Sequence, residues 1–190
     1  MDHTKKLGGL LVVGALAAAA PAAADDVFLR LDGVRGESTD ARHKGEIEIL
    51  SYTQSFTGPF AHGTTGTAAA AGKTVCGPVT LKKFVDVSSP DLILSVANGK
   101  HIPTAVITFR RPGGATQPEY YKVTLDDVII TEIEQTESKI DASNPTAARA
   151  MEKVSLIGRR FRFEFVQQAP DGRVAATPKA GWDCVANSKV

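Results

Sequence analysis

One short helical pattern stands in a chain whose other patterned segments all alternate like β-strands, and this contrast limits the fold more than any other feature. Residues 88–91 read Ser-Ser-Pro-Asp. Ser89 is suited to cap the free amides of a helix start, and Pro90 suits the first helical position. Asp91 would then meet the positive end of the helix dipole. These residues predict a helix that begins at this point.

The same helix has a predicted apolar face and a clear end. An Asn-Gly pair at residues 98–99 is typical of a helix C-terminus, because glycine adopts the left-handed conformation at little cost. Helical spacing predicts one apolar face on this segment, with the polar residues pointing elsewhere. The residues assigned to that face are Leu92, Ile93, Val96 and Ala97.

Alternating apolar residues predict strands over most of the remaining chain, at 26–34, 46–56, 102–111, 119–134 and 154–165. In the fourth of these, the apolar positions change parity at Asp126-Asp127, which predicts a β-bulge there. The last long strand changes parity at Gly158 in the same way. Two long strands that change face predict a strongly bent structure, either a barrel or a coiled sandwich.

The first 24 residues have the pattern of a secretory signal peptide. Two lysines, Lys5 and Lys6, precede an apolar run over 7–20, and an A-x-A site predicts cleavage between Ala24 and Asp25. The alternative is an uncleaved anchor, but the run is shorter than the about 20 residues that span a membrane. We therefore expect a signal peptide at 1–24, a single domain at 25–190, and a secreted product, extracellular or periplasmic.

Charge and composition indicate few partners. The chain has 22 basic and 21 acidic residues, and removal of the signal segment leaves the two kinds equal in number. A neutral domain gives no indication of nucleic acid or of an acidic membrane surface as a partner. We expect no cofactor, no metal and, after signal removal, no membrane contact.

A loop rich in Gly, Ala and Thr is predicted at 57–72, where almost no side chain could fill a core. Long loops in compact domains are usually functional or disordered. Residues 66–74 approach a phosphate-binding loop, but five residues separate the glycines where that motif has four. The residues that follow are strand-like, so this interpretation is rejected.

Catalytic interpretations have weak support. No pair of His43, His62 and His101 has zinc-ligand spacing. A hydrolase triad could be drawn from His101, Asp126 or Asp127 and a serine, but no nucleophile-elbow motif is present. We expect no enzyme activity. The acidic and basic clusters in the long strands are interpreted as solvated surface.

Cys76 and Cys184 are the two cysteines of the chain. An oxidising compartment permits a disulfide between them, and both lie in or beside predicted strands. The alternative is two separate buried thiols. We favour the disulfide, although the spacing of the two residues does not by itself bring them together.

The chain resembles the haemolysin-coregulated protein (Hcp) family of bacterial type VI secretion. The resemblance extends from about Asp26 to Cys184, and it rests on five stretches in the same order. They are FLRLDGVRGES at 28–38, KKFVDVSSP at 82–90, GKHIP at 99–103, PEYYKVTL at 118–125, and Gly181-Trp182.

The resemblance implies a mainly β fold, namely a compact antiparallel β-barrel of two curved sheets with one short α-helix. It further implies homohexameric rings that stack into a tube, with a spike protein and small effector proteins as partners. The loop after the second strand would contribute to contacts between stacked rings. In this chain the loop residues assigned to ring stacking are Thr57, Gly58, Pro59, Phe60, His62 and Gly63.

One departure from the family pattern leaves two hypotheses open. Tube proteins of this family are generally made without a cleaved signal, whereas this chain carries one. It is therefore either a ring-forming tube and carrier protein, or an exported binding protein that keeps the fold and acts outside the secretion machine. An exported hydrolase is a distant third hypothesis.

Overall fold

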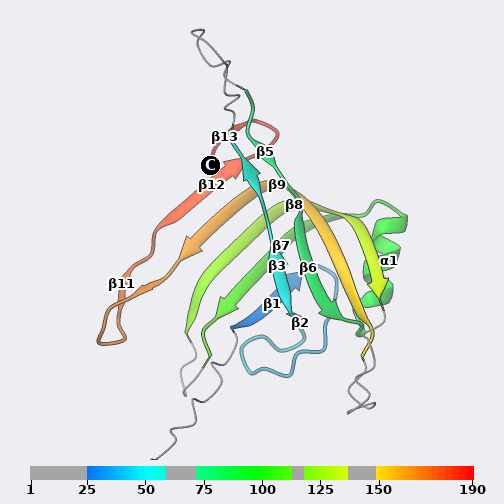
Figure 1. Cartoon of the computed structure of the whole chain (residues 1–190), viewed down its shortest axis with the longest axis horizontal. Helices are drawn as coiled ribbons and strands as arrows, with labels where there is room; N and C mark the ends of the chain where they lie inside the picture. Colours follow the sequence, from blue (N-terminus) through cyan, green and yellow to red (C-terminus); the bar gives the residue numbers. More distant parts are fainter. Residues whose placement is uncertain (1–24, 59–71, 113–117, 137–148) are drawn as a thin grey trace, which may run out of the picture.

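The computed structural model describes residues 25–58, 72–112, 118–136 and 149–190 (Figure 1). These residues form thirteen strands and one helix, α1 (Ser89–Ala97). The strands are β1 (Asp26–Leu31), β2 (Ile47–Ile49), β3 (Ser51–Thr53), β4 (Phe56–Thr57), β5 (Val75–Cys76), β6 (Val79–Phe84), β7 (His101–Arg110), β8 (Glu119–Thr136), β9 (Met151–Phe165), β10 (Gln167–Gln168), β11 (Val174–Ala176), β12 (Lys179–Asp183) and β13 (Ser188–Lys189).

Two long antiparallel strands, β8 and β9, connect all the larger pieces of the sheet (Figure 1). The second half of β9 pairs with β12, and its first half pairs with β6. On the other side, β8 pairs with β7, β7 with β1, and β1 with β2. Thus β9 has different partners along its two halves within one nine-stranded sheet.

The strands form a circuit that pairing closes everywhere except between β2 and β3, which are consecutive in the chain. From β9 the path runs through β6 to β3, which follows β2 after the single residue Leu50. Since β2 pairs with β1, and β1 leads through β7 and β8 back to β9, the ladder returns to its start. The predicted fold class, mainly β with curved antiparallel sheets and one short helix, is confirmed.

The predicted change of parity in β8 is confirmed, but the predicted bulge at Asp126-Asp127 is wrong. Leu125 and Val128 are both buried, so the inward face changes between them. The pairing of β8 with β9 nevertheless stays in register across this point and shifts only between Ile130 and Glu132. Both strands change face at the same place, so neither needs an extra residue there.

Close packing and an unusual backbone conformation mark this bend. A Cβ atom on Gly158 would lie 3.0 Å from the Cβ atom of Leu125, so only glycine lets the two strands approach this closely. Asp127 adopts a positive φ of 54°. Backbone strain of this kind is tolerated where the surrounding structure imposes it.

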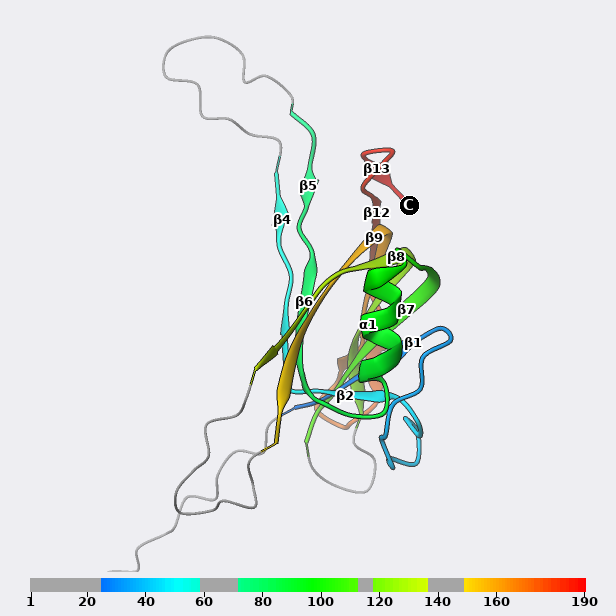
Figure 2. The same cartoon turned by 90° about the vertical axis from the view of Figure 1, so that its right-hand side faces the viewer.

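The core lies inside the circuit of strands and extends to one side of α1. Its buried members come from β1, β2, β6, β7, β8, β9 and the helix, and they include Leu29, Ile47, Leu81, Leu92, Ile107, Val123, Leu156 and Phe161. The helix packs against β8 (Figure 2). No helix among the described residues is long and apolar enough to cross a membrane.

The helix is present where predicted, but its start and its buried face differ from the prediction. Ser88 rather than Ser89 is the N-cap residue, and its amide donates to Asp86 Oδ1 at 2.8 Å. The buried residues of the helix are Ser89, Leu92 and Ser95, whereas Ile93 is 45% exposed. Serine is small, so this polar-looking stripe lets the helix approach the sheet more closely than bulkier apolar residues would.

Candidate assembly site

An arm made of β4 and β5 extends from the body of the domain, and we use "the arm" for residues 54–58 and 72–77. Phe56 pairs with Cys76 and Thr57 with Val75, in antiparallel register. The amide of Gly77 donates to the carbonyl of Ser55 at 2.8 Å, at the base of the arm. Figure 2 shows β4 and β5 side by side, continuing upward from β6 to about the level of β13. The segments on either side of the predicted Gly- and Ala-rich loop are therefore paired, whereas residues 59–71 lie outside the described residues.

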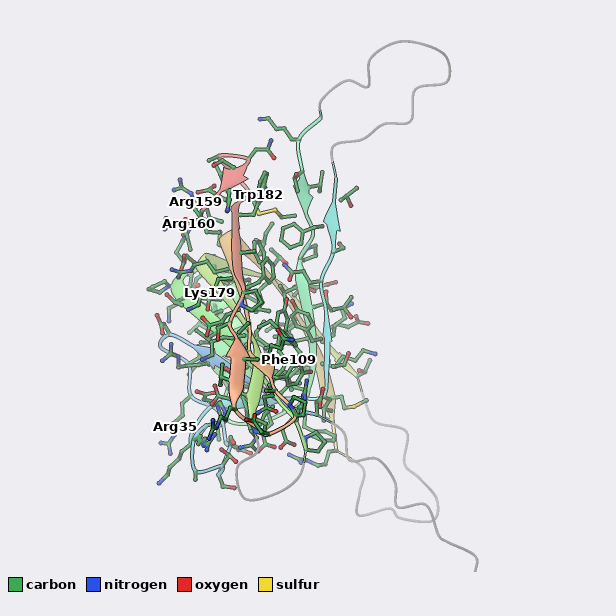
Figure 3. The ribbon with its side chains drawn as sticks, turned by 90° about the vertical axis from the view of Figure 1, so that its left-hand side faces the viewer. Arg35, Phe109, Arg159, Arg160, Lys179 and Trp182 are labelled. Carbon is green, nitrogen blue, oxygen red and sulfur yellow. A yellow bond between two sulfur atoms is a disulfide. The ribbon has the colours of Figure 1, made fainter. Side chains whose placement is uncertain are left out.

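A disulfide joins the arm to the C-terminal part of the domain. Cys76 and Cys184 are bonded, with their Cα atoms 6.1 Å apart and a separation of 108 positions in the chain. A second link lies beside it, because the amide of Thr74 donates to Asn187 Oδ1 at 3.0 Å. Figure 3 shows the disulfide near Trp182, at the end of β12. This is the cysteine pairing that the sequence favoured.

Aromatic contacts attach β4, the other strand of the arm, to β9. The ring of Phe56 meets those of Phe161 and Phe163 edge-on, with centroids 5.3 and 5.7 Å apart. Edge-to-face geometry of this kind is a favourable arrangement for aromatic rings. Phe56 itself remains 39% exposed. The arm is therefore attached to the core through β4 and to the C-terminal turn through β5.

Asp183 shapes the turn that carries Cys184. Its Oδ1 atom accepts the amides of Ala186 at 2.7 Å and Val185 at 3.0 Å, and its Oδ2 atom lies 3.3 Å from Arg159 Nε. The hydrogen bond from Ala186, with the charge of Arg159, holds the pKa of Asp183 below its ordinary value. The ionised carboxylate is thus part of what positions Cys184.

The stability contributed by Asp183 is expected to depend on pH. Because its folded-state pKa is lowered, the contribution is complete above the unfolded-state pKa of about 4 and is lost as the pH falls through the folded-state pKa. Asp183→Asn should therefore be less stable than the parent at pH 6, and the difference should shrink towards pH 2. Thermal unfolding of both proteins across this range measures it. Asp32→Asn, at an exposed carboxyl, is the control, and a difference that stays constant with pH would contradict the assignment.

A buried charged cluster, which the sequence analysis missed, anchors the start of α1. Lys83 Nζ donates to Glu152 Oε1 at 2.7 Å and to Asp86 Oδ1 at 2.8 Å. Ser89 Oγ also donates to Glu152 Oε1, at 2.8 Å. The side chains of Lys83 and Glu152 are 1% and 0% exposed. The sequence did hold a signal, since Lys83 has the same parity as the buried residues Val79 and Leu81.

The polar segment after β1 folds back over that strand. His43 is buried and its ring stacks on Phe28 with centroids 4.2 Å apart. The guanidinium of Arg110 lies 5.0 Å from the centre of the Phe28 ring, and it donates a hydrogen bond to Asp40 Oδ2 at 2.7 Å. The hydrogen bond from Arg110 lowers the pKa of Asp40. This segment is a folded cover rather than a free loop.

The structure accounts for the predicted stacking and cleavage residues only in part. Thr57 lies in β4, and Gly58 follows it in an exposed position, whereas Pro59, Phe60, His62 and Gly63 lie outside the described residues. Ala24 also lies outside them. Asp25 is exposed and accepts a hydrogen bond of 2.6 Å from Tyr120 Oη. Burial, together with Asp25, raises the pKa of Tyr120 to about 12.

The residues considered for a hydrolase come together only in part. His101 Nδ1 lies 2.9 Å from Asp127 Oδ1, and both side chains are largely exposed. Asp126 instead lies 2.6 Å from Arg162 Nη2. Within the part of the chain that the structure describes, no serine hydroxyl hydrogen-bonds to His101. Among the described residues, the pair is thus not joined to a hydroxyl nucleophile of the kind that a hydrolase triad contains.

This fold, a bent antiparallel β domain with one helix among the described residues, is shared with a solved protein. It matches a solved type six secretion system protein with a TM-score of 0.78 at 21% identity, over 88% of this chain and all of the other. The family model described as "Type VI secretion system effector, Hcp" matches residues 28–165. The chain belongs to the Hcp family.

Individual relatives agree with this assignment. The chain is 31% identical to protein hcp1 of Pseudomonas aeruginosa over 159 residues, which is 83% of this chain and 94% of the relative. The crystal structure of Hcp1 from Salmonella typhimurium matches with a TM-score of 0.69 and 30% identity, over 88% of this chain and 100% of the other. The predicted family resemblance is confirmed.

Proposed function

We propose that the chain is a structural and carrier subunit that forms six-membered rings able to stack and to hold small effector proteins. The observation that carries this proposal is the match to Salmonella Hcp1, which includes the whole of that chain at 30% identity. A subunit whose fold is kept along its full length retains the surfaces that a ring needs. The role requires no catalytic group.

The arm is the part of the domain that we assign to contacts between stacked rings. It extends away from the body (Figure 2) and is held at both strands, by Phe56 and by Cys76. A projection fastened at its base can reach a neighbouring ring without losing its direction. The spike protein and effectors are the further partners of this role.

Export through the general pathway is the second part of the proposal. The signal pattern at 1–24 would be removed, leaving a single domain at 25–190 in an oxidising compartment. The Cys76–Cys184 disulfide supports this, because disulfides persist mainly in such compartments. Mass spectrometry of the exported protein should find Asp25 as its first residue, and an intact leader would contradict the proposal.

Assembly of the purified mature chain is the first test. We expect negative-stain images and sedimentation to show six-fold rings for residues 25–190 in the oxidised state. A matched variant in which a short Gly-Ser turn replaces residues 58–73 should keep the rings but lose the stacks. A monomer at high concentration would contradict the ring proposal, and stacks that persist in the shortened variant would contradict the role of the arm.

The alternative function is an exported binding protein with the Hcp fold that acts outside the secretion machine. The signal pattern at 1–24 favours it, because tube proteins of this family are generally made without a cleaved signal; the disulfide suits either function of an exported chain. Measuring release from cells with and without the secretion machine separates the two functions. Release that needs the machine supports the tube role, and equal release from both kinds of cell supports the alternative.

A further inference from the structure

We propose that the Cys76–Cys184 disulfide is a redox latch: closed, it holds the arm against the C-terminal turn, and its reduction releases the arm while the body stays folded. The inference concerns how the arm is regulated, and its consequence for ring stacking rests on the proposed function. The latch itself needs only the residues that the structure describes.

Few links join β5 to the C-terminal turn of the domain. Among the described residues, the disulfide and the Thr74–Asn187 hydrogen bond are the links from β5 and the residue before it to the C-terminal turn. Val75 is 61% exposed and contributes no burial there. One covalent bond and one hydrogen bond thus carry most of the attachment on this side of the arm.

The C-terminal turn has its own supports, which do not depend on the disulfide. Asp183 accepts two amides within the turn, and the amide of Cys184 donates to the carbonyl of Arg159 at 2.8 Å. When the disulfide opens, this side of the latch is expected to keep its position. The strand that loses its anchor is β5.

The body has supports that are separate from both cysteines. Its strands close a circuit through β1, β7, β8, β9, β6 and β3, and the core packs inside it. Both cysteines pack at the edge of the core, and the amide of Cys184 donates to Arg159 of β9, but neither cysteine lies in the strand pairings of that circuit, since Cys76 pairs with Phe56 of β4 and Cys184 follows the end of β12. Local opening of the arm is therefore separable from unfolding of the whole domain.

The chemistry of the latch is thiol–disulfide exchange with a dithiol reductant. A thiolate of the reductant attacks one sulfur of the disulfide, which releases the first protein thiol and leaves a mixed disulfide. The second thiol of the reductant then attacks the reductant's own sulfur in that mixed disulfide and releases the second protein thiol. Each protein sulfur gains one electron and one proton, and the dithiol loses two of each as it closes to its own disulfide. Both cysteines are only half-buried, so a small reductant can reach them.

The latch has a consequence for where the protein can assemble. Thiols stay reduced in the cytosol and are oxidised outside it. A chain in a reducing compartment would carry a released arm, and the same chain after export would carry a held one. If the arm makes contacts between rings, stacking would become stronger after export without any other change in the protein.

Hydrogen exchange followed by mass spectrometry tests the latch on the mature protein. On addition of dithiothreitol, amides of residues 72–77 are expected to exchange at least about tenfold faster through local opening, while those of β7 and β8 stay protected and speed up only as far as the lowered free energy of global unfolding requires. The double variant Cys76→Ser with Cys184→Ser should show the fast pattern without reductant and should not respond to it. Asn187→Gly, which removes the hydrogen bond but keeps the disulfide, is the matched control and should still respond to dithiothreitol.

Two results would overturn the proposal. Unchanged exchange at residues 72–77 would mean that the other contacts hold the arm, and complete loss of protection throughout β7 and β8 would mean that the domain does not stay folded without the disulfide. Sedimentation of the same samples reports ring formation separately. A protein that forms no rings can therefore still show the latch, and rings can form without it.

Discussion

Replacing Lys83 with methionine is expected to lower the free energy of unfolding by about 3–5 kcal/mol, because it leaves a buried carboxylate without its cation. Glu152 is fully buried and receives its shortest hydrogen bond from Lys83, at 2.7 Å. Asp86, 9% exposed at its side chain, would lose the same partner. Folded domains are stable by only about 5–15 kcal/mol, so a loss of this size is a large part of the total. Urea unfolding of the purified variant measures it.

Neighbouring Lys82 provides the matched control. It lies on the same strand but points to solvent, so Lys82→Met should change stability by no more than about 0.5 kcal/mol. The double variant Lys83→Met with Glu152→Met should recover much of the loss, since apolar residues of similar size often replace a buried ion pair at little cost. Equal effects at Lys82 and Lys83 would show that the buried cluster contributes nothing specific.

Removal of the disulfide is expected to lower the free energy of unfolding by a similar amount, but by freeing the unfolded chain rather than by weakening contacts in the folded one. Replacing both cysteines with serine frees a loop of 108 residues in the unfolded chain. The chain-entropy model puts the cost at about 4–5 kcal/mol, and measured losses for native disulfides are about 2–5 kcal/mol. Denaturant unfolding of the oxidised protein and the variant gives the difference. With a typical total stability of about 5–15 kcal/mol, the variant is expected to stay folded at 25 °C and to melt at a lower temperature.

Single variants and reductant serve as controls for this prediction. Cys76→Ser and Cys184→Ser should each be as destabilised as the double variant, because either one opens the loop. Reduced parent protein should behave as they do. If loss of the disulfide left the free energy of unfolding unchanged, a cost in the native state would have to offset the loop-closure entropy. The bridge would then constrain the arm without stabilising the domain.

Local features were readable from the sequence because their causes are local. The Ser-Pro-Asp start and the Asn-Gly end place α1 within a residue of its observed bounds. The parity change at Asp126-Asp127 follows from alternation of apolar residues, and the structure confirms it. The cysteines were recognised as candidates for a bridge, but nothing local showed that Cys76 and Cys184 meet.

Features that depend on register were missed or were wrong. Alternation indicated that Lys83 shares a face with Leu81, yet its partner Glu152 is set by the pairing of β6 with β9, which places the two residues directly opposite each other. The predicted bulge was wrong for the same reason, because whether a change of parity needs an extra residue depends on whether the partner strand changes face at the same place. The buried face of α1 was also misassigned, because Ile93 is exposed and Ser95 is buried.

The arm shows most clearly the difference between what local sequence predicts and what contacts between distant residues decide. Composition indicated a loop at 57–72 between strand-like segments, but it gave no sign that those segments pair with each other, as Phe56 does with Cys76. The sequence by itself determined which residues form strands, where the helix lies and which family the chain resembles, since spacing and end signals act over a few residues. Only the tertiary structure decided the closed circuit, the buried cluster and the disulfide-held arm. Each of these joins residues far apart in the chain, and a period of two along a strand specifies its faces but not its neighbours.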